Sequence, residues 1–278
     1  MAASRTRSIA VTSGKGGVGK SCIALNLAIA LSRRQQRVLL VDADLGLGSI
    51  AILAGLNPEF VVEDVLAGRC EVVEAVAGGP EGIVVLPASV DADATQWERL
   101  EPAEDIWAPL EEFEAGFDVV VLDTGAGIGA KVVDFAAAAD EVLLLVTPEP
   151  TAIADAYAAL KILVQRRPPQ GLGLLVNMAD SAAEAEDLYV KFQEMAERFL
   201  GAKIDNRGYI PLDRYVRESV KRQTPFVLAN PPLPAAEALV RLSDELLADG
   251  EGASPRGGGI FARILEQRNL SIFSDRMQ

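Results

Sequence analysis

Short apolar runs alternate with stretches of helical periodicity between about residues 8 and 226. The runs are rich in Val, Ile and Leu, and several are apolar throughout, as expected of parallel strands that are covered on both faces. They predict strands at residues 9–12, 38–41, 83–86, 119–122, 142–146, 172–176 and 208–210. The stretches between and after them predict helices at residues 20–33, 63–67, 103–114, 131–139, 151–166, 182–200, 214–222 and 235–247.

This alternation predicts βαβ units and an α/β fold, with a doubly wound, mostly parallel sheet that carries helices on both faces. We expect a single domain over residues 8–248, preceded by a short polar N-terminus at residues 1–7. In such sheets ligands bind beyond the carboxyl ends of the strands. The chemically distinctive residues of this chain fall at those ends.

The chain changes character beyond the last predicted helix of the domain. Residues 249–259 read DGEGASPRGGG, and this composition predicts a flexible linker. Within residues 260–278, one helical stripe holds Ile260, Phe261, Ile264 and Leu265. We expect an amphipathic tail that binds a membrane surface; a tail packed into a groove of its own domain, or a disordered end, is the alternative.

Composition and charge exclude several kinds of chemistry. Lys and Arg number 26 against 40 Asp and Glu, a formal net charge of −14, which disfavours a protein that coats nucleic acid. The absence of histidine excludes histidine bases, Ser-His-Asp triads and histidine-bound metals. The two cysteines, Cys22 and Cys70, form no C-x-x-C pair. Because no apolar run reaches the roughly 20 residues of a membrane-spanning helix, we expect a cytoplasmic protein.

The segment Gly14-Lys-Gly-Gly-Val-Gly-Lys-Ser21 fits the phosphate-loop pattern G-x-x-x-x-G-K-[ST]. Its glycines let backbone N–H groups approach phosphates, and the helix that begins near Lys20 adds a positive N-terminal dipole. We expect Lys20 to reach the β- and γ-phosphates and Ser21 to offer its hydroxyl to Mg²⁺. Lys15 is a second cation in the loop, and the spacing alone leaves its role open.

Carboxylates end two predicted strands near this loop. Asp123 follows an apolar run, which is the Walker-B arrangement that holds Mg²⁺ directly or through water. Asp42 and Asp44 end the second strand, where one can contact a water of Mg²⁺ and the other can orient the attacking water. A turn or helix-cap role is the alternative for this pair. Gly127, in a loop that can move, could present its N–H to the γ-phosphate.

Polar residues near two other strand ends suit a purine ring. Asn177 follows the strand at residues 172–176, and a side-chain amide can pair its donor and its acceptor with a purine edge. Asp213, which follows Pro211 and Leu212, could act in the same way. Each is a weak signal alone, because Asn and Asp after a strand are common turn residues.

Together these residues resemble a known family. Lys15-Gly-Gly-Val-Gly-Lys-Ser21 resembles the deviant Walker A of the MinD/ParA ATPases, in which the extra lysine is the signature. The resemblance is greatest to the flagellar-number regulator branch, FlhG/FleN, also called YlxH or MotR, and covers about residues 8–247. The segments that carry it are residues 42–48, 123–127, 147–157 and 208–213.

The resemblance implies an ATPase that binds ATP and Mg²⁺ and forms a homodimer with ATP. Catalysis would rest on Lys20, on Asp44 at the attacking water, and on Lys15, which reaches the nucleotide of the second copy. The implied ligands of Mg²⁺ are Ser21, Asp42 and Asp123. The implied nucleotide contacts are Gly14, Lys15, Gly16, Gly17, Val18, Gly19, Lys20, Ser21, Cys22, Gly127, Asn177, Pro211 and Asp213.

The same branch implies partners and a location. Its ATP-bound dimer acts on a flagellar transcription activator or with the SRP-type GTPase FlhF, turnover is slow and depends on dimer or partner, and a C-terminal helix associates reversibly with the inner membrane. In this chain that helix would lie in residues 260–278. Two departures stand out: Gly48-Ser49 replaces the Ala-Asn or Arg-Asn of many relatives, and residues 1–8 lack the Gln- and Leu-containing activator motif, which leaves a GTPase-activating role open.

Other interpretations stay open at this point. A chromosome or plasmid partition ATPase would need a cationic surface for DNA, although the net charge leads us to expect no strong direct DNA binding. A division-site regulator of the MinD type and a nucleotide-locked scaffold that barely hydrolyses ATP are further alternatives. Iron–sulfur carriers are disfavoured because the two cysteines lie far apart. The best candidates for a cationic surface are Arg207, Arg214, Arg217, Lys221 and Arg222.

Overall fold

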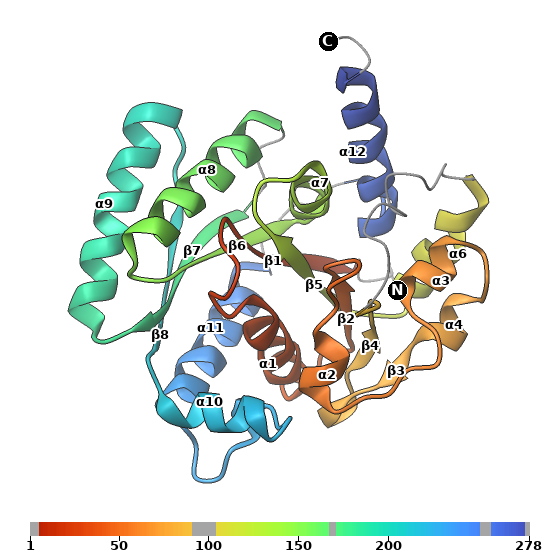
Figure 1. Cartoon of the computed structure of the whole chain (residues 1–278), viewed down its shortest axis with the longest axis horizontal. Coiled ribbons are helices and arrows are strands. Elements are labelled where there is room, and N and C mark those ends of the chain that lie inside the picture. Colours follow the sequence, from red (N-terminus) through yellow and green to blue (C-terminus); the bar gives the residue numbers. More distant parts are fainter. Residues whose placement is uncertain (1–5, 91–103, 167–170, 251–256, 276–278) are drawn as a thin grey trace.

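The computed structural model describes residues 6–90, 104–166, 171–250 and 257–275. Within them the chain forms one sheet with the strand order β3–β4–β2–β5–β1–β6–β7–β8, which is parallel except for β3 against β4 (Figure 1). The predicted doubly wound, mostly parallel sheet is thus confirmed. The strands are β1 (Arg7–Ser13), β2 (Val38–Ala43), β3 (Ala77–Gly78), β4 (Val84–Leu86), β5 (Val119–Ala126), β6 (Glu141–Val146), β7 (Gly171–Ala179) and β8 (Asp205–Pro211).

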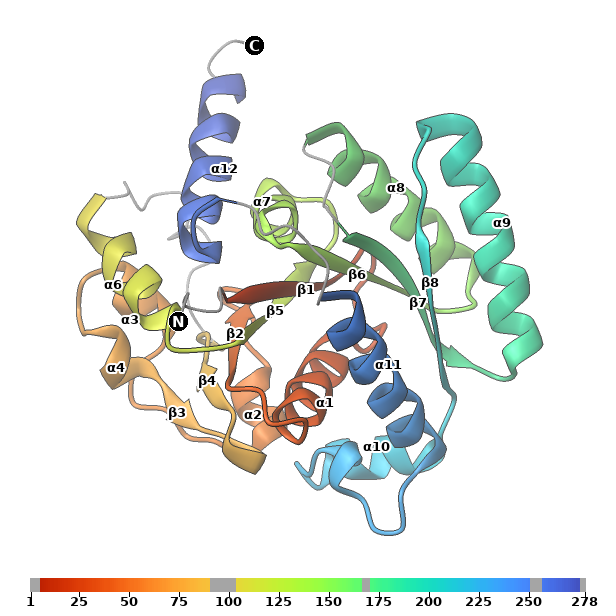
Figure 2. The ribbon, with the colours of Figure 1, turned by 180° about the vertical axis from the view of Figure 1, so that it is seen from behind.

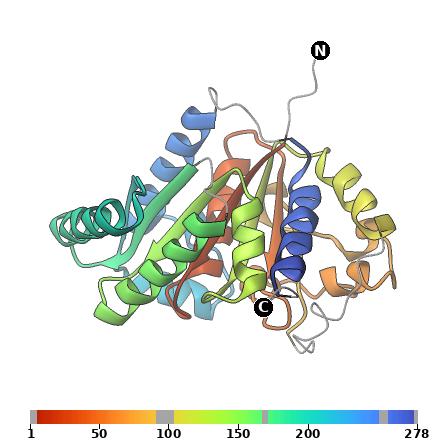
Figure 3. The same cartoon turned by 90° about the horizontal axis from the view of Figure 1, so that it is seen from above.

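Helices cover both faces of this sheet (Figure 3). α1 and α11 pack on one face, α7, α8 and α9 pack on the other, and α12 lies between α7 and α6. Two 3₁₀ turns, η1 (Pro80–Gly82) and η2 (Phe226–Leu228), occur in loops. The α-helices are α1 (Lys20–Ser32), α2 (Ile50–Ala54), α3 (Val62–Leu66), α4 (Val72–Ala75), α6 (Glu104–Glu114), α7 (Ala130–Ala138), α8 (Pro150–Arg166), α9 (Ala182–Leu200), α10 (Arg214–Lys221), α11 (Pro234–Gly250) and α12 (Ile260–Asp275).

The central strands are buried along their length because helices lie on both sides of them. Every residue of β2 and of β6 is buried, which explains their nearly continuous Val and Leu content. β1 lies between β5 and β6, at the point where the strand order reverses. The loop after β1 therefore opens where doubly wound sheets bind their ligands.

Some elements differ from the sequence prediction. α2, α4 and β3, which have five, four and two residues, were not predicted. α11 continues to Gly250, so the first two residues of the predicted linker belong to a helix. Residues 251–256 of that linker lie outside the described part of the chain.

The C-terminal segment follows the alternative given for it, a tail packed against its own domain, rather than an exposed amphipathic tail. α12 packs between α6 and α7 as part of the domain and is not a detached tail (Figure 2). Ile260, Phe261 and Ile264 are buried in that position. The apolar stripe that suggested a membrane contact is covered by the chain's own helices, because the helical layer leaves a space between α6 and α7 that this stripe fills.

Polar contacts fix the start of α12. The Glu114 carboxylate accepts a hydrogen bond from the backbone N–H of Ile260 (2.8 Å), which places a negative charge at a helix N-terminus. The buried guanidinium of Arg263 donates to the backbone oxygen of Ala138 (2.7 Å) and to the hydroxyl of Ser8 (2.8 Å). Of the helices that the structure describes, none combines the length and the apolar content needed to span a membrane.

Candidate functional site

The phosphate loop joins β1 to α1, and two of its positions require glycine. A Cβ on Gly14 would collide with the backbone oxygen of Asp155 in α8. Gly19 has a φ of 93°, and a Cβ there would lie 2.6 Å from Nδ2 of Asn177. That amide nitrogen donates to the backbone oxygen of Val18 (2.7 Å), so the predicted adenine residue at the end of β7 also fixes the phosphate loop.

Lys20 and Asp123 lie together in the interior beside the loop. Lys20 begins α1 and is only 7 % exposed, and Asp123 in β5 is completely buried. Burial lowers the pKa of Lys20, and the carboxylates of Asp123 and Asp44 oppose this effect. The surrounding negative charge therefore favours the ammonium form that binds phosphate.

Asp123 provides a test of whether Mg²⁺ fits this site. Burial raises the pKa of Asp123 well above its usual value and the Asp42 carboxylate adds to the rise, while Ser21 and Lys20 oppose it. Neither Asp123 oxygen accepts a hydrogen bond of normal geometry from the described residues. Two buried oxygens without a donor, beside a hydroxyl and at the end of a phosphate loop, suit a hard cation such as Mg²⁺.

The structure holds no conventional metal cluster in the residues it describes. No group of three or more His, Cys, Asp and Glu side chains is arranged there to bind a metal ion. An Mg²⁺ that arrives with a nucleotide takes ligands from phosphates and water, so one hydroxyl and one carboxylate are sufficient on the protein side. Ser21 and Asp123 meet that lower requirement.

Asp42 is engaged elsewhere. It pairs in register with Asp123, yet its carboxylate accepts hydrogen bonds from the backbone N–H groups of Asp44 (3.1 Å), Ser49 (2.9 Å) and Ile50 (3.0 Å). Burial raises the pKa of Asp42 to about 6. These bonds close the loop after β2 and hold the start of α2. The helix-cap alternative, rather than the Mg²⁺ shell, accounts for the geometry of Asp42 in this structure.

Asp44, in the loop after β2, lies against the end of β5. A Cβ on Gly125 would lie 2.9 Å from Oδ1 of Asp44. Burial raises the pKa of Asp44, and the ammonium groups of Lys20 and Lys131 limit the rise. Lys131 also donates to the backbone oxygen of Leu45 (2.9 Å) and so ties α7 to the Asp44 loop. The Asp44 carboxylate thus lies close to the ammonium group of Lys20, and its role at an attacking water stays a prediction.

Lys15 contacts its own chain. Its ammonium donates to Oε2 of Glu149 (2.7 Å) and to Oγ1 of Thr151 (2.9 Å) at the start of α8. The Glu149 side chain is 63 % exposed, and an ion pair of this kind contributes at most about 1 kcal/mol. Lys15 can therefore leave this contact at small cost when a phosphate is offered to it.

Gly127 is also engaged within the chain. It has a φ of 98°, and its N–H donates to the backbone oxygen of Ser13 (3.0 Å) at the end of β1. A contact between this N–H and a γ-phosphate requires the loop after β5 to shift. Gly16 and Gly17, by contrast, are exposed at the tip of the phosphate loop.

Asn177 and Asp213, the two residues predicted to lie near adenine, line one small cavity together with two other predicted nucleotide contacts, Cys22 and Pro211. The cavity has a volume of about 50 Å³, which is too small for a purine ring. Oδ1 of Asp213 accepts a hydrogen bond from the N–H of Tyr215 (2.8 Å) and begins α10, whereas Oδ2 is buried without a partner among the described residues. Adenine can enter here only if α10 moves outward, and Oδ2 then offers an acceptor to its amino group.

Comparison with known proteins assigns the family. A profile of the CobQ/CobB/MinD/ParA nucleotide binding domain matches residues 9–226, which is most of the chain. The chain belongs to this family. The predicted membership of the MinD/ParA group is thereby confirmed.

Named relatives of this MinD/ParA-type domain agree with the predicted branch. The antiactivator FleN of Pseudomonas aeruginosa is 40 % identical over 252 residues, which cover 90 % of this chain and 89 % of FleN. The flagellum site-determining protein YlxH of Helicobacter pylori is 34 % identical over 221 residues, which cover 77 % of this chain and 74 % of YlxH. The solved structure of the cell division ATPase MinD of Pyrococcus furiosus superimposes with a TM-score of 0.73 at 26 % identity, covering 87 % of this chain and 98 % of that one.

Sequence analysis missed residues that hold the Asp44 loop of this MinD/ParA-type domain. The buried Glu63 carboxylate accepts hydrogen bonds from the N–H groups of Gly46 (3.1 Å) and Ser89 (3.1 Å). Gly48 donates to the backbone oxygen of Ser89 (2.9 Å), and a Cβ at this position would collide with the backbone oxygen of Ala88. The departure noted at position 48 thus follows from a close approach of two loops. No local pattern around Glu63 signals its role, because its partners come from two other segments.

Proposed function

We propose that this protein is an ATP-dependent dimerising switch, with slow ATP hydrolysis, that regulates the number or placement of flagella. The observation that carries the proposal is the 40 % identity with FleN over 90 % of the chain. A match of that extent goes far beyond the phosphate loop, which many unrelated nucleotide-binding proteins share. The similarity to YlxH points to the same process.

The position of each site residue supports a part in hydrolysis. Lys20 and the N–H groups of its loop bind the β- and γ-phosphates of ATP. Ser21 and Asp123 would hold Mg²⁺, which when bound adds positive charge at the phosphates. Asp44 lies close to the ammonium group of Lys20, and it orients the attacking water.

Exposed apolar side chains support a dimer interface at the carboxyl end of the sheet, where the phosphate loop lies. Leu47, in the loop after β2, is 72 % exposed, and Ile128, in the loop after β5, is 50 % exposed. Large apolar side chains exposed next to a ligand site favour a contact surface. Lys15 lies at the same end of the sheet, held by its exposed pair with Glu149 and a hydrogen bond to Thr151, and turns to the nucleotide of the second copy. Loss of the γ-phosphate frees both loops, and the dimer separates.

Reversible contact with the inner membrane is part of the proposal and requires α12 to leave its site. In the domain, Ile260, Phe261 and Ile264 are already buried. Insertion into a bilayer therefore exchanges one apolar environment for another, and a single helix gains little. Two helices in one dimer gain more through effective concentration. Dimerisation is accordingly the step that favours the membrane.

Complementation of a flagellated bacterium that lacks its own member of this branch tests the proposal. The wild-type chain is expected to restore the number and position of flagella seen by electron microscopy. Lys20→Ala should fail, because it removes the phosphate contact. The matched control is Lys161→Ala, which changes an exposed lysine of α8 and should restore flagella like the wild type. Equal restoration by Lys20→Ala would contradict a nucleotide-dependent role.

The cations of α10 favour a DNA-binding partition ATPase as a second candidate. Arg207 does not belong to this surface, because it is only 9 % exposed and pairs with Glu141 and Asp249. The cations on or next to α10 that have no salt-bridge partner among the described residues are Arg214, Arg217, Lys221 and Arg222.

DNA retention separates the two candidates. A short duplex at about 0.15 M salt should release the ATP-bound protein, because a net charge of −14 opposes binding to phosphates. Retention that is lost in Arg214→Ala and Lys221→Ala but kept in Lys161→Ala would favour the partition function. A phosphate-release assay addresses the third alternative, since a nucleotide-locked scaffold would bind ATP without measurable turnover.

A further inference from the structure

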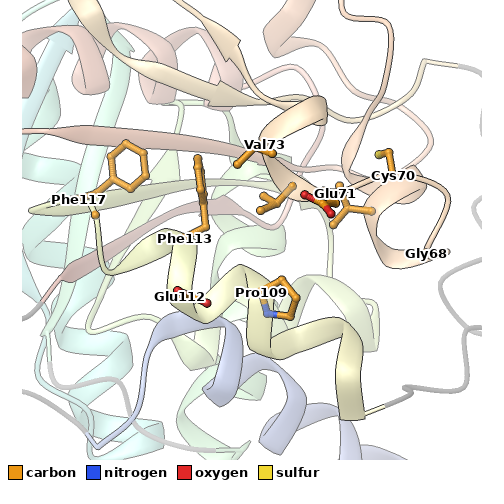
Figure 4. A pocket seen from close by; sticks show the side chains of 11 residues that line it. Gly68, Cys70, Glu71, Val73, Pro109, Glu112, Phe113 and Phe117 are labelled. Carbon is orange, nitrogen blue, oxygen red and sulfur yellow. The ribbon is translucent and has the colours of Figure 1, made fainter.

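A groove lies between α4 and α6 (Figure 4). No residue of the phosphate loop lines it. Its volume is about 770 Å³, and most of its lining is apolar. Phe113, Phe117 and Pro109 come from α6 and the turn after it, and Val73 comes from α4. None of the proposed nucleotide residues takes part in it.

The floor of the groove is formed by packed aromatic and aliphatic side chains. The rings of Phe113 and Phe117 pack against each other with centroids 5.3 Å apart. Val65 and Val72 are buried and close the groove from the side of α3 and α4. Val73 stands at the lip and is 58 % exposed. An exposed aliphatic side chain beside two aromatic rings and an open cavity is typical of a contact surface.

The rim of the groove is acidic. Glu71, which precedes α4, and Glu112, on α6, line it, and both are exposed and without a salt-bridge partner among the described residues. Arg69, the cation next to this rim in sequence, is paired with Asp64 through its Nη2 (2.7 Å) and Nε (2.8 Å). Unpaired negative charge therefore borders an apolar floor.

We propose that this groove docks an amphipathic, basic segment of a partner protein, with large apolar side chains in the groove and Lys or Arg beside Glu71 and Glu112. The negative charge of the rim favours a partner segment that is positively charged. The two helices that flank the groove favour a segment that is helical, as in other grooves that bind a helix. α6 has 11 residues and is about 16 Å long, which matches roughly three turns of a docked helix. The docked segment leaves the phosphate loop accessible, so it can bind with or without nucleotide.

The probe for this site is a fluorescein-labelled synthetic helix of about 16 residues, with Leu on one face and Lys and Ala on the other. Its binding to the full-length protein is measured by fluorescence anisotropy. Val73→Asp should weaken binding by roughly tenfold or more, because it places a charge at the apolar lip. Glu112→Lys should weaken binding and reduce its dependence on salt.

Matched controls carry the same substitutions on α9, away from the groove. Val190→Asp replaces a valine that is 43 % exposed, and Glu194→Lys reverses an exposed charge, and neither should change the affinity. A probe with Glu in place of Lys, and one with Ser in place of Leu, should both bind far more weakly. Equal affinity for all protein variants, or for all three probes, would overturn the proposal.

The thiol of Cys70 locates the probe, because this residue lines the groove and is partly accessible. The helix should slow the reaction of Cys70 with a disulfide reagent. In Cys70→Ser, the part of the thiol reaction that the helix slows should be missing. Unchanged reactivity at saturating probe would place the helix elsewhere and contradict the proposal. A small apolar dye gives a second test. If the dye binds the wild type but not Val73→Asp, and the helix fails to displace it, the proposal is contradicted.

Discussion

Two neighbouring carboxylates dominate the electrostatics at the carboxyl end of the sheet. Asp42 and Asp123 pair in register on β2 and β5, and burial raises the pKa of each. A buried charge without sufficient compensation costs free energy of folding. Lys20 offsets part of that cost in the nucleotide-free protein. The backbone N–H groups that donate hydrogen bonds to Asp42 offset another part.

Asp123→Asn is expected to stabilise the nucleotide-free protein by about 1–3 kcal/mol, because it removes a completely buried charge whose oxygens accept no hydrogen bond of normal geometry. The raised pKa means that the folded protein binds more protons than the unfolded chain, so the wild type loses stability as pH rises from about 4. The advantage of the variant should therefore grow with pH. Urea unfolding in EDTA measures it.

The matched control for this prediction is Asp180→Asn, which changes an exposed carboxylate at the end of β7. It should leave the free energy of unfolding nearly unchanged. With Mg²⁺ and ATP the wild type should instead be more stable than Asp123→Asn, because the variant then lacks a metal ligand. A variant that is less stable than the wild type at every pH, even without nucleotide, would show that the Asp123 charge is compensated in the folded state.

Lys20→Ala should lower the affinity for ATP by roughly ten- to a hundredfold, since it removes a charged donor from the phosphates. Isothermal titration calorimetry measures the loss, with Lys161→Ala as the control. Removing this lysine also removes the cation that stands against Asp123 and Asp44, so circular dichroism should accompany the titration. ATP binding of wild-type strength in Lys20→Ala would remove the basis for the phosphate loop.

At this scale the sequence predicts residues whose motif is local. Lys20 and Asp123 follow strands in a fixed pattern, and the structure places them side by side. Glu63 and Lys131 escaped prediction because each contacts a loop from a different part of the chain. The hydrogen bonds of Asp42 were not predicted either. A carboxylate that follows a strand gives the same sequence pattern whether it faces Mg²⁺ or backbone N–H groups.

Among the elements, α12 is held both by its buried apolar stripe and by the polar contacts of one buried cation, Arg263. Arg263→Ala removes contacts with the backbone oxygens of Ala138 and Gly258 and leaves Asp140 without its ion pair. Breaking a buried pair is costly, so α12 should open more often. Hydrogen exchange of residues 260–267 is expected to accelerate, while the affinity for ATP stays unchanged.

The control for this substitution is Arg241→Ala, which removes an exposed arginine from α11. It should leave the exchange of residues 260–267 as in the wild type. Equal exchange in Arg263→Ala and the wild type would show that the apolar contacts hold α12 by themselves.

Long elements could be predicted from the sequence, whereas for α12 the sequence left two places open, a membrane surface and a groove of its own domain. The buried strands β2 and β6 carry nearly continuous apolar runs, and the long helix α9 carries helical periodicity over 19 residues. α12 carries an apolar stripe that fits a bilayer and a space between two helices equally well. Only the tertiary structure shows that α6 and α7 leave such a space, and that Glu114 on α6 faces the N-terminus of α12.

For the whole molecule, the buried position of α12 sharpens the expected link between nucleotide and membrane. The ATP-bound dimer should sediment with vesicles that contain anionic lipid, because two released helices act together. The ADP-bound protein should stay in the supernatant, because its α12 remains against α6 and α7. Removal of residues 260–278 should abolish sedimentation and leave ATP binding intact. Equal sedimentation of the full-length and truncated proteins would show that another surface binds the vesicles.

The mass of the protein in solution tests the central claim, that ATP drives dimerisation and hydrolysis ends it, most directly. Light scattering is compared for the wild type, Asp44→Ala and Lys15→Ala with Mg²⁺ and either ATP or ADP, alongside a phosphate-release assay. In ATP, Asp44→Ala should persist at twice the chain mass of 29.5 kDa and release little phosphate, whereas Lys15→Ala should bind ATP and form no active dimer. Both should be monomeric in ADP. An Asp44→Ala protein that binds ATP but remains monomeric would contradict the account.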